Sequence, residues 1–204
     1  MATVESPLEL CTFDDVMVHP ALAGFRESKT ENPHLQTWIA QAIKAFSATV
    51  ERVCDRPLRL TVRTEILDVP WGASMVSLRA YPVTDVQEVR ESSDQDWTTA
   101  ALTATDYVLY QQGRTGLLQF IVQRVGGPQS LRVIYTGGIA ADLQHVPDDL
   151  RDAAATHIAY LVMRAPTLHL ESQGIMQGSA TMFSKGSMLP GVREVLDDYT
   201  RRVG

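Results

Sequence analysis

The chain has 204 residues, 45% of them hydrophobic, which is enough for one domain or for one domain with an insertion. Its net charge of -6 argues against general nucleic-acid binding, because that function needs clustered Lys and Arg side chains to neutralise phosphates. No apolar run approaches the ~20 residues of a membrane span, and the first residues lack the pattern of a signal peptide. We therefore expect a globular protein made in a reducing cytoplasm.

The first predicted helix is short. Thr12 is its N-cap and Asp15 completes a capping box, while Pro20 follows soon after. Residues 24–33 are polar and indicate a loop. The clearest amphipathic helix comes next and ends before Pro57, because the residue before a proline avoids the helical conformation. Its apolar residues recur at steps of three and four: Leu35, Trp38, Ile39, Ala42, Ile43, Phe46, Val50 and Val53.

The hydrophobic period then changes to two. Leu58, Leu60, Val62, Thr64 and Ile66 alternate with Arg59, Thr61, Arg63 and Glu65. This alternation is typical of a half-buried strand. Shorter strands are predicted at about 74–80, 83–91, 106–111, 116–123 and 130–136, and Gly or Pro residues separate several of them. The spacing favours an antiparallel meander over alternating βα units.

Residues 131–166 carry the strongest structural pattern. A β-rich strand runs into a turn at Gly137 and Gly138, and a helix is predicted to begin at Pro147. Asp148 and Asp149 lie in its first turn, where the helix dipole favours acids, so we interpret them as structural. The helix is apolar almost all round, which predicts burial on several sides. Its apolar residues are Leu150, Ala153, Ala154, Ala155, Ile158, Ala159, Leu161 and Val162.

The C-terminal part contains a loop and a short helix. The loop, at 171–187, is rich in Gly, Ser and Met. Its apolar residues either fold back on the chain or contact a partner, and they are Ile175, Met176, Met182 and Phe183. The helix is predicted over 189–203, with an apolar stripe of Val192, Val195, Leu196, Tyr199 and Val203. That stripe either packs on its own subunit or docks on another protein.

These elements predict an α+β protein. A small helical bundle scaffold, formed by 8–57 and 147–203, carries an inserted antiparallel β region at 58–138. We expect the whole chain, 1–204, to form a single domain.

Residues suited to catalysis or metal binding do not occur at useful spacings. The five His residues lack the spacing of metal ligands, and Cys11 and Cys54 are expected to be reduced, buried thiols. The segment around Ser179 is too short for a nucleophile elbow, and the glycines at 126–127 lack the Lys-Ser/Thr of a phosphate loop. We therefore predict no catalytic residue, no metal and no cofactor.

Five segments carry a resemblance to one known family. They are a helix ending in Arg-Pro (Ile39–Pro57), a strand–Pro–strand segment (Leu78–Val89), Trp97 with a D-Y-x-L strand (Asp106–Leu109), a strand–Gly-Gly–Val-Pro–Asp–helix element (Val133–Arg164) and a closing helix (Leu189–Arg202). In this order they resemble the head–tail connector proteins of long-tailed bacteriophages, also called adaptor or head completion proteins. The order of the motifs is more specific than any single motif.

The resemblance implies a structural virion protein in the neck of the particle, assembled in the host cytoplasm. It implies a homo-oligomeric ring of twelve copies beneath the portal protein. The ring would extend the DNA channel, let DNA pass without specific binding, and offer a docking surface to a stopper or tail terminator protein. The C-terminal segment would engage the portal or a neighbouring subunit through Val192, Val195, Leu196, Tyr199, Arg201 and Arg202.

Two other classes of function stay open from the residues alone. One is a small soluble enzyme whose site is not recognisable in the sequence, and the other is a monomeric β-rich module that binds a small ligand. Rings with a central hole would favour the adaptor, whereas a compact monomer with a deep apolar pocket would favour the alternatives.

Overall fold

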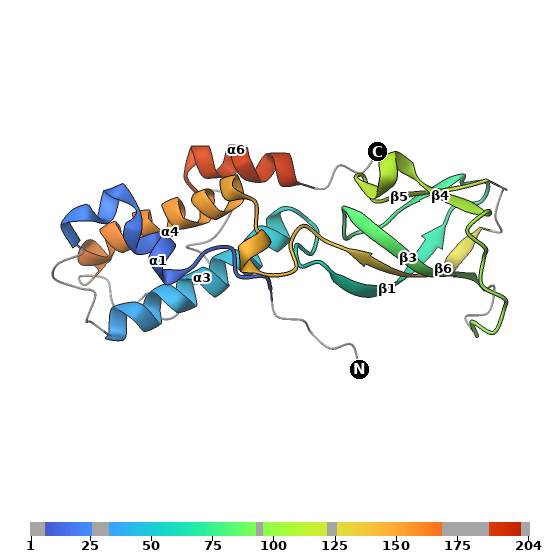
Figure 1. The fold of residues 1–204 in the computed structure, drawn as a ribbon, viewed down its shortest axis with the longest axis horizontal. Coiled ribbons are helices and arrows are strands. Elements are labelled where there is room, and N and C mark those ends of the chain that lie inside the picture. Colours follow the sequence, from blue (N-terminus) through green and yellow to red (C-terminus); the bar gives the residue numbers. More distant parts are fainter. Residues whose placement is uncertain (1–6, 26–32, 93–95, 122–125, 169–187, 201–204) are drawn as a thin grey trace. The chain divides into compact units, whose positions relative to one another are not determined.

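The computed structural model describes residues 7–25, 33–92, 96–121, 126–168 and 188–200. Two compact units divide the chain (Figure 1). Among the described residues, the helical unit contains those up to Asp55 and those from Asp142 to Thr200, and the β unit contains those from Arg56 to Ala141. The predicted α+β class is confirmed. That both units form a single domain stays a prediction, because compactness does not measure whether they unfold together.

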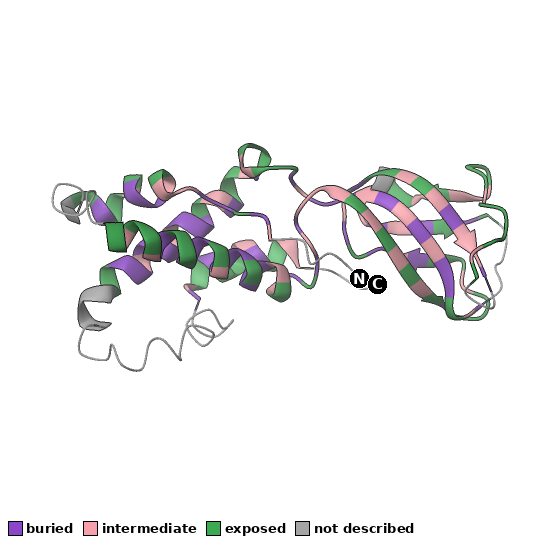
Figure 2. Cartoon of the chain, turned by 90° about the horizontal axis from the view of Figure 1, so that it is seen from below, coloured by how far each residue is buried: buried purple, intermediate pink, exposed green. Residues whose placement is uncertain are grey.

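The helical unit is built around one central helix, α4, which contacts α1, α3, α6 and a 3₁₀ turn, η1. The elements are α1 (Phe13–Val18), η1 (Pro20–Phe25), α3 (Pro33–Val53), η3 (Leu143–His145), α4 (Asp148–Leu168) and α6 (Pro190–Tyr199). The eight apolar residues of this helix that the sequence analysis names are all buried. Buried positions occur around α4 along most of its length (Figure 2). The prediction of a helix buried on several sides is therefore confirmed.

Local signals in the sequence set the ends of the first helices. The Thr12 hydroxyl accepts a hydrogen bond from the Asp15 backbone N–H at 2.9 Å, and the Asp15 carboxylate accepts one from the Thr12 N–H at 2.7 Å. This is the predicted capping box. The helix α3 buries the middle of its apolar stripe and ends before Asp55, whose φ of 51° lies in the left-handed region that Asp tolerates.

The start of α4 differs slightly from the prediction. The helix begins at Asp148, so Pro147 lies just before its first turn rather than inside it. The Pro147 carbonyl accepts a hydrogen bond from the Arg151 N–H at 2.9 Å, as an N-cap residue does. Asp148 and Asp149 occupy the first turn as predicted.

The β unit consists of two three-stranded antiparallel sheets. Sheet one has the order β1 (Thr61–Val69), β6 (Gly127–Gly137), β3 (Val83–Glu91). Sheet two has the order β2 (Met75–Ser77), β5 (Leu117–Phe120), β4 (Tyr107–Leu109), and a 3₁₀ turn η2 (Tyr110–Gly113) follows β4. The antiparallel pairing is confirmed, but the predicted meander is wrong. Turn residues mark where strands end without specifying which strands pair, and here β6 pairs along both of its edges.

One cluster of buried apolar side chains joins the two sheets. Sheet one supplies Leu131, Val133 and Tyr135 from β6, and sheet two supplies Leu118 and Phe120 from β5. Because alternate residues of a strand point to opposite faces, the residues between them on these strands lie on the outer faces of the unit.

The strand β1 is half-buried as predicted, but its buried face is not the one that the sequence predicts. Its polar residues Arg63 and Glu65 lie on the half-buried face, whereas Val62 and Ile66 are 52% and 50% exposed. Hydrophobic alternation alone would place the apolar set inward. The structure reverses this expectation.

A hydrogen-bond network explains why Glu65 faces inward. Its carboxylate accepts a hydrogen bond from the Tyr135 hydroxyl at 2.7 Å and from the Arg79 backbone N–H at 3.2 Å. The Tyr135 hydroxyl in turn accepts one from the Ala80 N–H at 3.0 Å. Tyr135 is fully buried, and its burial, together with the Glu65 charge, raises the pKa of its hydroxyl. A partly desolvated network of this kind is costly to break, so it holds the register of β1.

Candidate functional site

The predicted portal-binding residues on α6 pack against their own helical unit. Val192 and Leu196 are buried, and Val195 and Tyr199 are half-buried. The Tyr199 hydroxyl donates a hydrogen bond to the Asp149 carboxylate at 2.8 Å, which ties the end of α6 to the start of α4. Docking by this stripe therefore stays a prediction, and it would require α6 to leave α4.

Arg201 and Arg202 lie outside the described residues, as do the predicted loop contacts Ile175, Met176, Met182 and Phe183.

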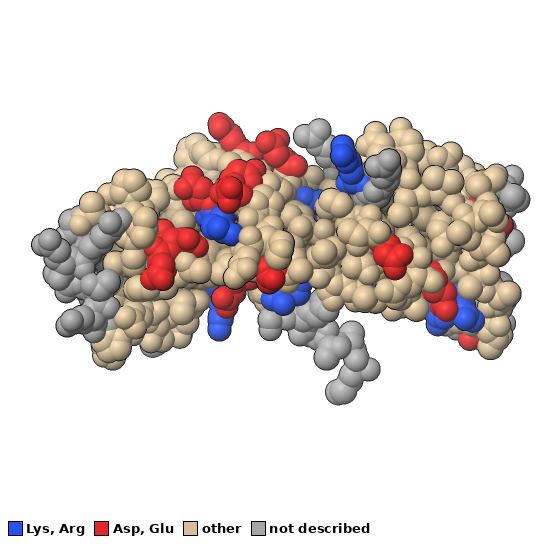
Figure 3. Space-filling view, in the orientation of Figure 1, with Lys and Arg blue, Asp and Glu red and all other residues tan. Residues whose placement is uncertain are grey.

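The face of the helical unit that Figure 3 shows is rich in acidic side chains. Asp and Glu side chains gather there over α1, α4 and α6 (Figure 3). By sequence, residues 1–55 and 142–201 contain 16 of the 24 acidic residues and 9 of the 18 basic ones. The β region, 56–141, contains eight of each. The negative charge of the protein is therefore concentrated in the helical part of the chain.

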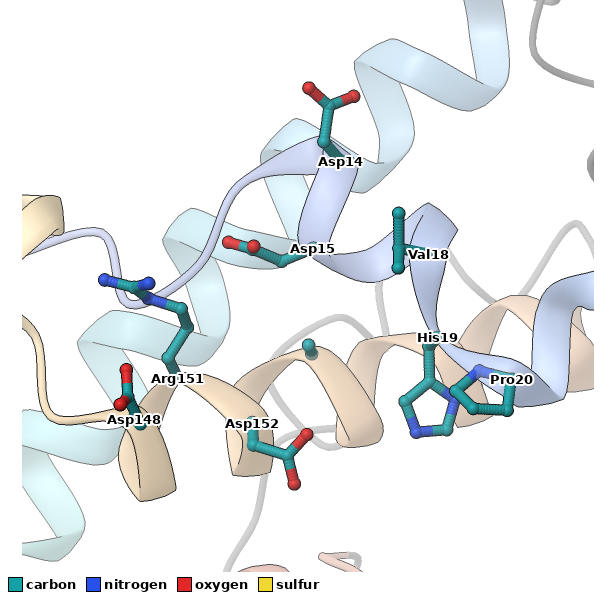
Figure 4. A pocket seen from close by; sticks show the side chains of 9 residues that line it. Asp14, Asp15, Val18, His19, Pro20, Asp148, Arg151 and Asp152 are labelled. Atoms are coloured by element: carbon teal, nitrogen blue, oxygen red, sulfur yellow. The ribbon is translucent and has the colours of Figure 1, made fainter.

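A pocket of about 330 Å³ lies within this acidic region, between α1 and α4. It is lined by Asp14, Asp15, Val18, His19, Pro20, Asp148, Arg151, Asp152 and Ala155 (Figure 4). Arg151 extends from α4 and donates a hydrogen bond to the Leu143 carbonyl at 2.8 Å. The polar part of the lining consists of four Asp side chains, His19 and Arg151.

Three of the histidines have separate local environments. His19 shares a hydrogen bond with Thr156 at 3.2 Å, and His145 contacts Asp142 at 2.7 Å. His157 is buried in α4 with its ring centroid 4.9 Å from that of Phe46. Among the residues that the structure describes, no group of three or more His, Cys, Asp or Glu side chains could hold a metal ion.

The two cysteines are buried and form no disulfide, as expected. Burial is the main cause that raises the pKa of the Cys11 thiol to about 12. A protonated, buried thiol is a poor nucleophile and a poor metal ligand, so Cys11 is a packing residue.

Over the described parts of the chain, no helix combines the length and the apolar character that a membrane span requires.

Several exposed apolar side chains on the β unit were not expected from the sequence. Val62 and Ile66 on β1, Met75 on β2 and Val108 on β4 are all 45% exposed or more. The alternation of β1 suggests the opposite orientation, and β2 and β4 are too short for a reliable pattern. No sequence signal separated these residues from core residues.

Comparison with known proteins places the chain in a family. The model of the Head completion protein family matches residues 21–203. A chain in the neck of a native gene transfer agent (GTA) particle with C12 symmetry has a TM-score of 0.55 and 18% sequence identity, covering 83% of this chain and 86% of that chain. No curated protein matches the sequence.

Two further GTA structures have the same fold. A chain in the neck of an empty GTA particle with C6 symmetry has a TM-score of 0.53 and 17% identity, with 80% of both chains covered. A chain in the virion of a native particle has a TM-score of 0.51 and 18% identity, covering 85% of this chain and 80% of that one. Because the family model spans nearly the whole sequence, this protein belongs to the Head completion protein family and is a structural head–tail connector protein of the virion.

Proposed function

We propose that this protein forms a ring beneath the portal of the capsid, extends the DNA channel and offers a docking surface to a stopper or tail terminator protein. The observation that carries the proposal is the family match over residues 21–203. The shared fold with chains in GTA necks of C6 and C12 symmetry supports a ring, and twelve copies would satisfy the higher symmetry. Assembly takes place in the host cytoplasm, and the protein has no catalytic role.

The portal contact is assigned to the C-terminal segment: Val192, Val195, Leu196 and Tyr199 on α6, with Arg201 and Arg202 after it. An apolar helical stripe suits a groove in a partner protein. The contact with α4 seen here would then belong to the free subunit, and docking would exchange it for a contact with the portal. The apolar residues of the loop, Ile175, Met176, Met182 and Phe183, are proposed to add an adaptable contact.

Truncation after Gly186 is expected to abolish binding to portal-bearing capsids, because it removes the whole stripe. It also uncovers the part of α4 that Val192 and Leu196 bury, so the truncated protein should unfold at a lower temperature. Truncation after Thr200 removes Arg201 and Arg202 but retains α6, and it should weaken binding with little change in stability. Sedimentation with purified capsids measures binding, and circular dichroism measures folding.

The Gly191→Ala variant is the matched control for both truncations. It alters α6 at a position where an added Cβ meets no atom within 4 Å, so it should bind capsids like the wild type. Normal capsid binding by the protein truncated after Gly186 would refute the portal role of the C-terminal segment.

DNA is expected to pass the ring without being held. Each contact between a phosphate and a Lys or Arg side chain adds affinity that would slow passage, and the acidic residues of this chain outnumber the basic ones by 24 to 18. We expect no measurable binding of duplex DNA at physiological salt by fluorescence anisotropy. Micromolar or tighter binding would contradict the picture of a passive channel.

A further inference from the structure

The outer face of sheet one carries an apolar strip along its edge strand β1, which we call the sheet-one face. It consists of Val62, Thr64 and Ile66 on β1 with Ile134 beside them on β6. Thr64 pairs with Ile134, and Val62 and Ile66 flank that pair along the strand. Val62 and Ile66 expose about half of their surface, and Ile134 is half-buried. Single exposed apolar residues are ordinary, but three on one sheet face form a patch. Next to this strip, on the same outer face, Arg132 pairs with Ile66 and Glu88 pairs with Ile134, and the Glu88 carboxylate lies 2.8 Å from the Arg132 guanidinium, so the two charges balance each other.

Sheet two carries a second such surface, the sheet-two face. Gln119 on β5 pairs with Met75 on β2 and with Val108 on β4, so these three side chains form one row across the sheet. Ile121 directly follows the end of β5 and is also exposed. Met75, Val108 and Ile121 are 45%, 52% and 61% exposed, and none of the four residues is charged.

The two faces lie on opposite sides of the β unit, because the shared core lies between the sheets. A ring of identical copies needs this arrangement. A head-to-tail ring contact is heterologous, so each copy must present two different surfaces, one to each neighbour.

The net charge of the β region, unlike that of the helical part, does not oppose the approach of a second copy of the chain. The β region contains eight acidic and eight basic residues, whereas the helical part is strongly acidic. Copies that met through their helical units would repel one another, and a basic partner would be drawn to that acidic surface instead. The sheet-two face carries no charge that would repel a second copy of the chain.

We propose that the sheet-one face of each copy packs against the sheet-two face of its neighbour in the ring. This inference rests on the proposed ring but adds which surfaces close it. Ile66 and Val108 would lose their contact with water at each interface. The outward-facing apolar side chains of β1 would then serve assembly.

Charge reversal across the contact tests this pairing on portal-bearing capsids. Ile66→Lys alone and Val108→Glu alone should each lower the number of copies bound per portal by about tenfold, because each buries an unpaired charge. The double variant I66K/V108E places opposite charges across every contact and should recover ring formation. The double variant I66E/V108E should not. Val18→Glu, on an exposed apolar residue of the helical unit, is the control and should assemble normally.

Disulfide crosslinking distinguishes a head-to-tail contact from a symmetric one. A chain with both Ile66→Cys and Val108→Cys should give a ladder beyond dimers after mild oxidation on the capsid, and either replacement alone should give monomers. The native Cys11 and Cys54 are buried and should not contribute. A wild-type protein that forms no ring would overturn the proposed function and this inference together. A wild-type ring that tolerates I66K and V108E, or single replacements that give dimers, would overturn this inference alone.

Discussion

Replacement of Gly137 by alanine is expected to lower the free energy of unfolding by about 3 kcal/mol or more. Gly137 ends β6, where its backbone passes close to the segment before β3. An added Cβ would overlap the Ala80 carbonyl oxygen and would lie 2.7 Å from Cε2 of Tyr135. The Ala80 oxygen belongs to the backbone and cannot rotate away. Tyr135 is fully buried, so its ring has no space to move into.

Urea denaturation followed by circular dichroism measures this effect. Gly191→Ala is the matched control, because it makes the same chemical change at an exposed position in α6 with no atom within 4 Å of the new Cβ. Alanine has the higher helix propensity, so this control should be neutral or more stable by up to about 1 kcal/mol. Equal stability of the two variants would show that the β unit can relax around Gly137.

Lowering the pH from 6.5 to 4 is expected to destabilise the protein through His157 by about 3 kcal/mol. Burial lowers the pKa of His157 to about 4, from an ordinary value of 6.5. Between these two values the unfolded chain binds a proton at this site and the folded protein does not. The free energy of unfolding therefore falls as the pH falls through this window. Above pH 7 the group is neutral in both states and contributes no pH dependence.

Denaturation of wild-type protein and His157→Gln at pH 4.5 and pH 7.5 isolates this contribution. Carboxylates also titrate in this range, but their effect is common to both proteins. The variant should therefore lose less stability between the two pH values than the wild type does. A variant at His157 whose pH dependence equals that of the wild type would show that this residue is protonated as easily in the folded protein as in the unfolded chain.

Most of the helical unit could be predicted from the sequence because its signals are local. The capping box of Thr12 and Asp15 lies within four residues, and the apolar stripe of α3 repeats within one helix. The burial of α4 on several sides follows from its composition, since a helix without a polar face must be covered. The order of the family motifs also follows from the sequence, and the family match confirms the connector identity that those motifs suggest.

The sequence by itself determined the elements, the α+β class and the connector family. Only the tertiary structure decided which face of β1 points inward, which strands pair, and that the apolar stripe of α6 packs on its own helical unit. Glu65 faces inward because Tyr135, seventy positions later, donates a hydrogen bond to it. Arg56, predicted only as part of a helix end, is buried with its guanidinium 4.0 Å from the centre of the Tyr81 ring. Such contacts join residues far apart in the chain, and hydrophobic periodicity reports only on neighbours, so no local pattern could have revealed them.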